Sequence, residues 1–417
     1  MNKFTYFLLT AILLSILTSF IYSQSGWYQV TSPATQELYG LYFKDINIGV
    51  CDKFKTTSGG QNWNQPLTGS SYAIMFPDPN IGWRTGTGIY KTTNLGDNWV
   101  LQPNPTGTSV LYGIYFINVN TGYACGELAK IIKTTNSGIN WVLLTSPISN
   151  SYYLNCIYFI DANIGFAAGY TTSGNPSVII KTIDGGLNWN VQNFPTGTGY
   201  SAISFVNSMT GIVVGIKAAK TTDGGTTWVS KSLPVEGFLY SMHFPSVNTG
   251  YAVGFGGTIL KTTDIGETWY QQACPVGTLR TIYFIDDNTG YACGNNGAVI
   301  KTTDGGGPPI GITPISTEVP SSYNLYQNYP NPFNPSTKIR FSIPQQNSPF
   351  EGGRGDDVVK LVVFDILGKE IAVLVNEQLS PGTYEIEWNA SDYPSGVYFY
   401  TLVTGVFSQT RKLILMK

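Results

Sequence analysis

Charge is the scarcest property of this 417-residue sequence. Only 12% of its residues are charged, and 23 basic residues against 25 acidic residues leave a net charge of −2. Proteins that bind nucleic acids or anionic membrane surfaces concentrate positive charge, so the composition argues against both kinds of partner. Glycine (47 residues) and tyrosine (27 residues) are abundant instead. These residue types favour many strands joined by tight turns.

Histidine is nearly absent, and the cysteines show no paired spacing. His243 is the single histidine, and the five cysteines include no Cys-x-x-Cys. Zinc sites and disulfide frameworks need such spacings. We therefore expect no metal and no cofactor, and we interpret most cysteines as small buried hydrophobic residues.

Long hydrophobic runs are missing except at the N-terminus. Lys3 precedes an apolar stretch from Phe7 to Leu17, and a small residue, Ser23, precedes Gln24. This pattern predicts a signal peptide over residues 1–23. The alternative is a single-pass anchor, although the run is shorter than the ~20 residues of a membrane span. We expect no transmembrane segment after cleavage.

One short phrase recurs through the first 300 residues. It reads Lys-Thr-Thr-x-x-Gly-x-x-Trp, with small variations, and its copies begin at Lys55, Lys91, Lys133, Lys181, Lys220, Lys261 and Lys301. Six copies end on a tryptophan: Trp63, Trp99, Trp141, Trp189, Trp228 and Trp269. The spacing of 36 to 48 residues is typical of four-stranded propeller blades. In the third copy we expect strands at 111–117, 123–126, 130–134 and 141–144.

The seventh copy indicates how the ring closes. It stops at Gly307-Pro308 without a tryptophan, whereas Gly26-Trp27-Tyr28 near the N-terminus resembles Asn140-Trp141-Val142. We therefore predict a seven-bladed β-propeller over residues 24–306, whose last blade takes its outer strand from the N-terminus through Trp27. Such pairing would remove two exposed sheet edges.

The repeated phrase resembles the Asp-box of sialidases and related propellers. The position of its acid is filled by short hydrogen-bonding residues: Ser58, Asn94, Asn136, Asp184, Asp223, Asp264 and Asp304. We interpret these residues as structural, because their oxygens can bond main-chain amides of their own turn while the tryptophan packs against the neighbouring blade. A catalytic acid would be needed only once, not in every repeat.

Together with Thr-Gly-Tyr-Ala-x-Gly, residues 26–306 resemble the propellers of photosystem II stability and assembly factors. That resemblance implies a protein that holds an assembling membrane subunit through a basic surface patch. This propeller contains only Arg84 and Arg280, so such a patch is not expected.

The C-terminal quarter lacks the repeat. A Gly/Pro/Thr/Ser linker is predicted at 307–320, and alternating segments after it predict a small Ig-like β-sandwich over 321–417. Ordered motifs, including Tyr329-Pro330-Asn331-Pro332 and Gly396-Val397-Tyr398, resemble the type A C-terminal sorting domain of the type IX secretion system. The resemblance implies a Gram-negative, Bacteroidota-like source, a partner in the secretion machinery bound through 321–417, and delivery through the periplasm to the cell surface or medium. It also implies removal of this domain; the alternative is an ordinary adhesive sandwich. Arg354-Gly355-Asp356 is interpreted as part of a loop.

No catalytic set stands out, so we expect a binding protein, not an enzyme. Sialidases clamp a carboxylate with several arginines, which two cannot supply, and acids such as Glu37, Asp52, Glu127 and Asp287 lie in no recognisable motif. His243 occupies a position filled by tyrosine in other repeats, which predicts a packing role. One register of the first strands predicts a binding face at the channel mouth: Tyr39, Tyr72, Tyr112, Asn155, Tyr240 and Arg280, with Ser201 in blade five.

These side chains could instead pack between blades. The leading hypothesis is an exported, monomeric, non-catalytic protein that binds a protein or glycan. The alternatives are a polysaccharide-active glycoside hydrolase and an assembly factor for a membrane complex.

Overall fold

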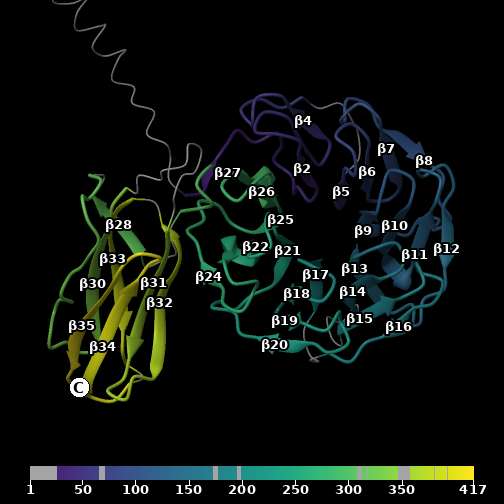
Figure 1. Cartoon of the computed structure of the whole chain (residues 1–417). Coiled ribbons are helices and arrows are strands. Elements are labelled where there is room, and N and C mark those ends of the chain that lie inside the picture. The colour runs from purple at the N-terminus through teal and green to yellow at the C-terminus, as the bar shows by residue number, and fades with distance from the viewer. Residues whose placement is uncertain are drawn as a thin grey trace, which may run out of the picture.

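Seven antiparallel sheets form a ring around a central channel (Figure 1). The computed structural model describes residues 26–64, 71–171, 177–194, 199–307, 312–316, 318–345, 357–379, 381–391 and 393–417. The first strand of each blade contacts the first strand of the next, and β25 (Leu279–Phe284) of the last blade contacts β2 (Leu41–Phe43) of the first. The inner strands therefore form a closed circle, as the repeat predicted.

The blades follow one another in chain order, with the first strand innermost. Blade I holds β2, β3 (Gly49–Cys51) and β4 (Phe54–Thr56), and among its described residues Asn64 forms a bridge to Lys55 at the outer position. Blade II holds β5 (Ala73–Met75), β6 (Gly82–Thr85), β7 (Ile89–Thr92) and β8 (Val100–Gln102); blade III holds β9 (Leu111–Phe116), β10 (Gly122–Gly126), β11 (Ile131–Thr134) and β12 (Val142–Leu144). Blade IV holds β13 (Tyr152–Phe159), β14 (Gly165–Thr171), β15 (Ser177–Thr182) and β16 (Asn190–Val191); blade V holds β17 (Tyr200–Phe205), β18 (Gly211–Gly215), β19 (Ala218–Thr221) and β20 (Val229–Lys231). Blade VI holds β21 (Leu239–His243), β22 (Gly250–Gly254), β23 (Ile259–Thr262) and β24 (Tyr270–Gln271); blade VII holds β25, β26 (Gly290–Gly294), β27 (Val299–Thr302) and β1 (Tyr28–Gln29).

The ring closes through the N-terminal strand. β1 pairs with β27, with Tyr28 opposite Lys301, and the outer strand of blade VII therefore comes from the start of the chain. Trp27 is only 6% exposed and lies edge-on to Phe284 at 5.6 Å. Its indole N–H donates to the Gln272 side-chain oxygen at 3.0 Å. The predicted seam is thus present, and it is buried.

Each Asp-box turn is held by a threonine and by the acid, amide or hydroxyl residue two positions later. In blade IV, Thr182 Oγ1 donates to Asp184 at 2.8 Å and accepts from the Gly186 N–H, while the Asn188 N–H donates to Asp184 at 2.9 Å. In five other boxes, the main-chain N–H of the residue before the tryptophan donates to the side-chain oxygen at this position, which belongs to Ser58, Asn94, Asn136, Asp223 or Asp264. These residues therefore bond the turn itself, as the sequence predicted.

The seventh box is completed across the break in the chain. Its Asp304 accepts from the N–H of Gly26 at 2.9 Å, and Gly26 directly precedes Trp27 as Asn188 precedes Trp189. The last Asp-box therefore joins residues 302–307 to residues 26–27, which lie at opposite ends of the propeller sequence.

Aromatic stacks join neighbouring blades. Phe159 of β13 lies face to face with Tyr123 of the preceding blade at 3.8 Å and edge-on to Trp189 of its own box at 6.0 Å. Similar face-to-face pairs join Trp83 to Phe116, Tyr251 to Phe284 and Tyr291 to Phe43. Trp27, Trp141 and Trp189 therefore belong to cores between blades, as expected.

The repeated lysine also bridges blades, a role that the sequence did not reveal. Lys133 lies over the Tyr123 ring and donates to the Gly185 carbonyl of the next box at 2.8 Å. Lys91 and Lys181 donate in the same way to the carbonyls of Ser137 and Gly224, whereas Lys220 forms an ion pair with the Glu267 carboxylate of the next box. Burial lowers the pKa of Lys133. These four lysines therefore tie their blades to the box of the following blade.

The C-terminal unit is a β-sandwich that lies beside the ring (Figure 1). One sheet has the order β28 (Ile312–Ser316), β33 (Gly382–Asn389), β30 (Ser336–Ile343) and β29 (Asn324–Leu325); the other has the order β32 (Glu370–Leu379), β31 (Asp357–Phe364), β34 (Gly396–Val403) and β35 (Ser408–Leu415). β28 lies inside the predicted 307–320 linker, so the sandwich takes its first strand from that segment through its pairing with β33.

Two predicted features fall outside the described residues. They are the signal peptide at 1–23 and Arg354-Gly355-Asp356.

Candidate binding site at the channel mouth

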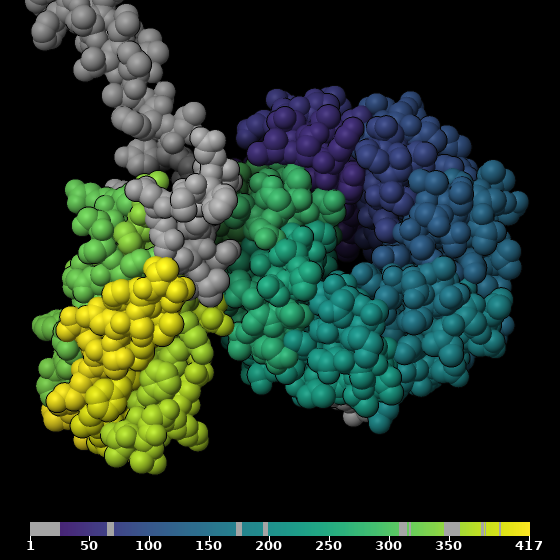
Figure 2. All heavy atoms as spheres, in the orientation of Figure 1, coloured from purple at the N-terminus to yellow at the C-terminus, as the bar shows by residue number. Residues whose placement is uncertain are grey.

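A hollow lies at the centre of the ring (Figure 2). At one end of the channel is a cavity of about 200 Å³, which we call the channel mouth. Every residue of the predicted binding face lines it, together with two residues that the sequence did not indicate. The full lining is Tyr39, Tyr72, Tyr112, Asn155, Tyr170, Ser201, Phe238, Tyr240 and Arg280.

In five blades the predicted residue is the extra residue of a β-bulge. In blade VI, Leu239 pairs with Gly254 and Ser241 with Val253, which leaves Tyr240 between them without a partner in the ladder. Tyr112, Asn155, Ser201 and Arg280 are skipped in the same way in their own blades. A bulge re-aims the side chain of the extra residue. The fold therefore turns one side chain per bulged blade toward the channel mouth.

A glycine opposite each bulge allows the two strands to come this close. A Cβ added to Gly254 would lie 2.2 Å from the Phe238 carbonyl oxygen, and one added to Gly169 would lie 1.8 Å from that of Tyr153. Gly126, Gly215 and Gly294 show the same close approach in the other bulged blades. These are the second glycines of Gly-Tyr-Ala-x-Gly and its variants. The repeated motif therefore shapes the channel mouth as well as the strand.

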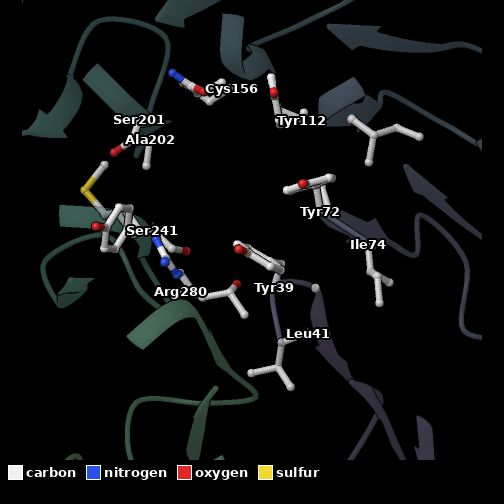
Figure 3. A pocket seen from close by; sticks show the side chains of 18 of the residues that line it. Tyr39, Leu41, Tyr72, Ile74, Tyr112, Cys156, Ser201, Ala202, Ser241 and Arg280 are labelled. Carbon is white, nitrogen blue, oxygen red and sulfur yellow. The ribbon is translucent and has the colours of Figure 1, made fainter. Parts of the chain in front are cut away.

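The tyrosines of blades I to III form an arc around the mouth (Figure 3). The ring of Tyr72 lies 5.0 Å from that of Tyr39 and 5.1 Å from that of Tyr112, edge-on to the latter. Tyr153 continues the arc at 6.0 Å from Tyr112. Tyr72 is the most open of these four, with 36% of its surface exposed. The arc thus presents aromatic surface to the channel at Tyr72.

Arg280 bridges the arc to the aromatic residues of blade VI. Its guanidinium lies 4.5 Å from the Tyr240 ring centre and 5.4 Å from that of Tyr39. It donates to Asn295 at 2.9 Å and to Glu37 at 3.3 Å. The Tyr39 hydroxyl also donates to Glu37, and this bond is the main cause that lowers the pKa of that carboxyl. Burial, followed by the Glu37 contact, raises the pKa of Tyr39 to about 12.

A second carboxylate fixes Tyr112. Glu127 begins the short helix η1 (Glu127–Ala129) and accepts from the Tyr112 hydroxyl at 3.2 Å and from the Val110 N–H at 2.9 Å. Burial, followed by the charge of Glu127, raises the pKa of Tyr112. Glu37 and Glu127 are supporting residues that sequence reasoning noted only as acids without a motif.

Blades IV and V contribute differently. The Asn155 amide donates to the Tyr200 carbonyl of blade V at 3.4 Å, and the Ser201 hydroxyl donates to the Leu239 carbonyl of blade VI. Both side chains line the mouth, but their hydrogen bonds join blades. Asn155 and Ser201 therefore line the channel mouth, as the sequence predicted, and also form contacts between blades, as the alternative interpretation expected.

The remaining candidates lie away from the mouth. Arg84 is 1% exposed and donates to Ser71 at 3.1 Å, and the Ser71 N–H in turn donates to Asp52. His243 lies beside Tyr283, and burial lowers its pKa to about 4, so at neutral pH it is uncharged and accepts from the Phe284 N–H at 3.3 Å. Both residues pack within the structure.

Three further findings concern membrane-spanning helices, metal clusters and cysteines among the described residues. These residues include no helix long and apolar enough to cross a membrane. No cluster of three or more His, Cys, Asp or Glu suited to a metal ion occurs among them. All five cysteines are free thiols, and Cys51, Cys125 and Cys293 are buried.

Comparison with known proteins supports both units. Residues 327–416 match the family described as secretion system C-terminal sorting domain, and residues 187–273 match the photosynthesis system II assembly factor YCF48 family. No curated protein is similar enough in sequence to match.

Solved propellers share the fold at low sequence identity. The structure of YCF48 bound to D1 peptide is 19% identical with a TM-score of 0.56, covering 67% of this chain and 97% of that one. YCF48 from Cyanidioschyzon merolae is 20% identical with a TM-score of 0.53, covering 67% and 99%. The WD40 propeller of Doa1 is 10% identical with a TM-score of 0.53, covering 66% and 96%. The chain therefore joins a β-propeller similar to that of YCF48 to a C-terminal sorting domain of the type IX secretion system, which directs it to the cell surface or the medium.

Proposed function

We propose that this protein is an exported, non-catalytic binding protein that holds its ligand at the channel mouth. The observation that carries the proposal is the set of five bulges. Each interrupts strand pairing and requires a glycine without room for a Cβ, and each turns one side chain toward the same cavity. Blades I and II take their places in the ring without such a register shift between their first two strands, so closure itself does not require the bulges.

The side chains at the mouth suit binding. Tyrosine and arginine are enriched in binding surfaces because they combine apolar area with polar tips. Here Tyr72 exposes aromatic surface, while Arg280, Tyr39 and Tyr112 are fixed by carboxylates. Such fixed side chains lose little conformational entropy when a ligand binds.

The environment of Glu37 favours binding over hydrolysis. A glycoside hydrolase needs a carboxylic acid whose pKa is raised so that it can donate a proton. The pKa of Glu37 is instead lowered by its contacts with Tyr39 and Arg280. A glycoside hydrolase with Glu37 and Glu127 as its acid pair is the second candidate, and the capture experiment also tests it.

Capture from the native cell surface tests the proposal. The chain from Gln24, immobilised, is exposed to outer-membrane extract and to culture fluid, and bound proteins and glycans are identified. Tyr72→Ala should lose the captured ligand, whereas Leu143→Ala, on the exposed outer strand β12, should retain it. Equal capture by the wild type and Tyr72→Ala would overturn the proposal. Shortening of a captured glycan during incubation would support the hydrolase instead.

A further inference from the structure

We infer that the ligand at the channel mouth is the end of a neutral saccharide chain. This inference rests on the proposed function and adds the chemical class of the ligand. It stands on three features of the mouth: the pairing of its charges, the arrangement of its aromatic rings and its size.

The charges at the mouth are already paired within the protein. Arg280 lies against Glu37 and Asn295, and Glu127 accepts from Tyr112 and from the Val110 N–H. An anionic ligand that approached Arg280 would also meet the negative charge of Glu37. Like charges that face each other across an interface cost free energy. Glu37 therefore selects against anionic ligands.

The protein's own guanidinium already occupies the aromatic faces of Tyr39 and Tyr240 that could hold a ligand cation. Arg280 lies over Tyr240 and Tyr39, so a ligand ammonium group would meet faces that already hold a guanidinium. The open aromatic surface is that of Tyr72, between Tyr39 and Tyr112. The C–H face of a pyranose is apolar and uncharged and fits such a surface. Its hydroxyl groups can donate to phenol oxygens and accept from the Arg280 guanidinium.

The size of the mouth admits the end of a chain. Its own volume is about 200 Å³, and seven of its nine lining residues also line the adjoining channel cavity of about 330 Å³. A saccharide chain that enters by its end would place one ring against Tyr72. Peptides are the competing class of ligand, and they are included in the test.

The test is binding of the chain from Gln24 to an array of neutral, anionic and cationic oligosaccharides and of peptides, followed by calorimetry with the best neutral binder. We expect neutral glycans to be captured. Their Kd should change less than about twofold between 50 and 500 mM NaCl, because salt screens charge interactions but not stacking. Tyr72→Ala should raise the Kd at least about tenfold, Tyr72→Phe should change it less than about threefold because the ring is kept, and Leu143→Ala should leave it unchanged. Thermal melts show that each variant is folded.

The failure of this inference is distinguishable from failure of the proposed function. The assignment of a neutral saccharide would be overturned if the array captured only charged glycans, no glycans at all, or peptides whose binding depends on Tyr72. The channel mouth would then still be the proposed binding site, with a ligand of another class. Glycan binding that is identical in wild type and Tyr72→Ala would overturn both.

Discussion

Trp27 makes the ring closure directly testable by a single substitution. It is 6% exposed, packs edge-on to Phe284 and donates to Gln272, whose side chain is fully buried. Replacing a buried tryptophan by alanine typically costs about 3–5 kcal/mol. Trp27→Ala should therefore destabilise the propeller by about that amount, although Trp27 lies close to Gln24, the predicted mature N-terminus.

The matched control is Trp228→Ala. Trp228 occupies the same box position in blade V, has the same 6% exposure, and directly precedes β20, a strand that is covalently continuous with its blade. If β1 is a full member of blade VII, the two substitutions should cost similar amounts. Removing residues 24–33 should cost at least as much, because it also uncovers the edge of β27.

The assay is urea unfolding of the chain from Gln24, followed by circular dichroism. The sandwich and the propeller can unfold separately, so their two transitions are fitted independently. A loss of about 3–5 kcal/mol from Trp228→Ala with less than about 0.5 kcal/mol from Trp27→Ala, within the usual range for surface substitutions, would refute the buried seam.

The repeated contacts support three further predictions. Gly254→Ala should destabilise blade VI by more than about 2 kcal/mol, because its Cβ would lie 2.2 Å from the Phe238 carbonyl oxygen; unchanged urea unfolding would contradict the required close approach. Lys181→Met should cost about 1–3 kcal/mol through the lost 2.7 Å bond to Gly224, whereas Lys44→Met, on an exposed turn, should cost nothing measurable; equal effects would contradict the interblade role. The Thr227 N–H and side chain lower the pKa of Asp223 to about 2. As pH falls, the unfolded chain therefore binds the proton before the folded chain does. The stabilisation that ionised Asp223 gives the folded protein above pH ~4 is lost as pH falls toward 2. In Asp223→Asn, thermal melts should show less loss of stability over this range; an equal loss would contradict the contribution of Asp223.

The repeat made most of the propeller predictable. Its spacing, the missing tryptophan in the seventh copy and the likeness between Gly26-Trp27-Tyr28 and Asn140-Trp141-Val142 predicted the strands and the seam, because every blade reuses the same local contacts. The register of the first strands also placed Tyr39, Tyr72 and Tyr112 together, since equivalent positions in a ring face one axis.

The chemistry of the mouth was less predictable. Arg280 meets Glu37 across the boundary between the first and last blades, and 243 residues separate them in the sequence. Glu127 reaches Tyr112 only because η1 turns back toward the start of β9. The second glycine of Gly-Tyr-Ala-x-Gly is compatible with a bulge, but a glycine within a strand can equally mark a tight bend or the close approach of another chain segment. Such contacts depend on main-chain geometry that residue patterns do not encode.

The role of the repeated lysine was in principle visible. A charged residue that starts every box of a propeller this poor in charge has a structural reason, and the structure supplies it as a bond to the next blade. By contrast, Asn155 and Ser201 could not be separated from the tyrosines by sequence, because the hydrogen bonds that occupy them end on carbonyls of neighbouring blades.

Titration of the captured ligand into the wild-type chain and into Tyr72→Ala tests the central claim most directly. We predict that the substitution raises the Kd at least about tenfold, or about 1.4 kcal/mol, while thermal melts show that the variant stays folded despite the loss of its ring contacts with Tyr39 and Tyr112. A Kd within about twofold of the wild-type value would show that the ligand binds elsewhere, and would contradict the assignment of the channel mouth as the binding site.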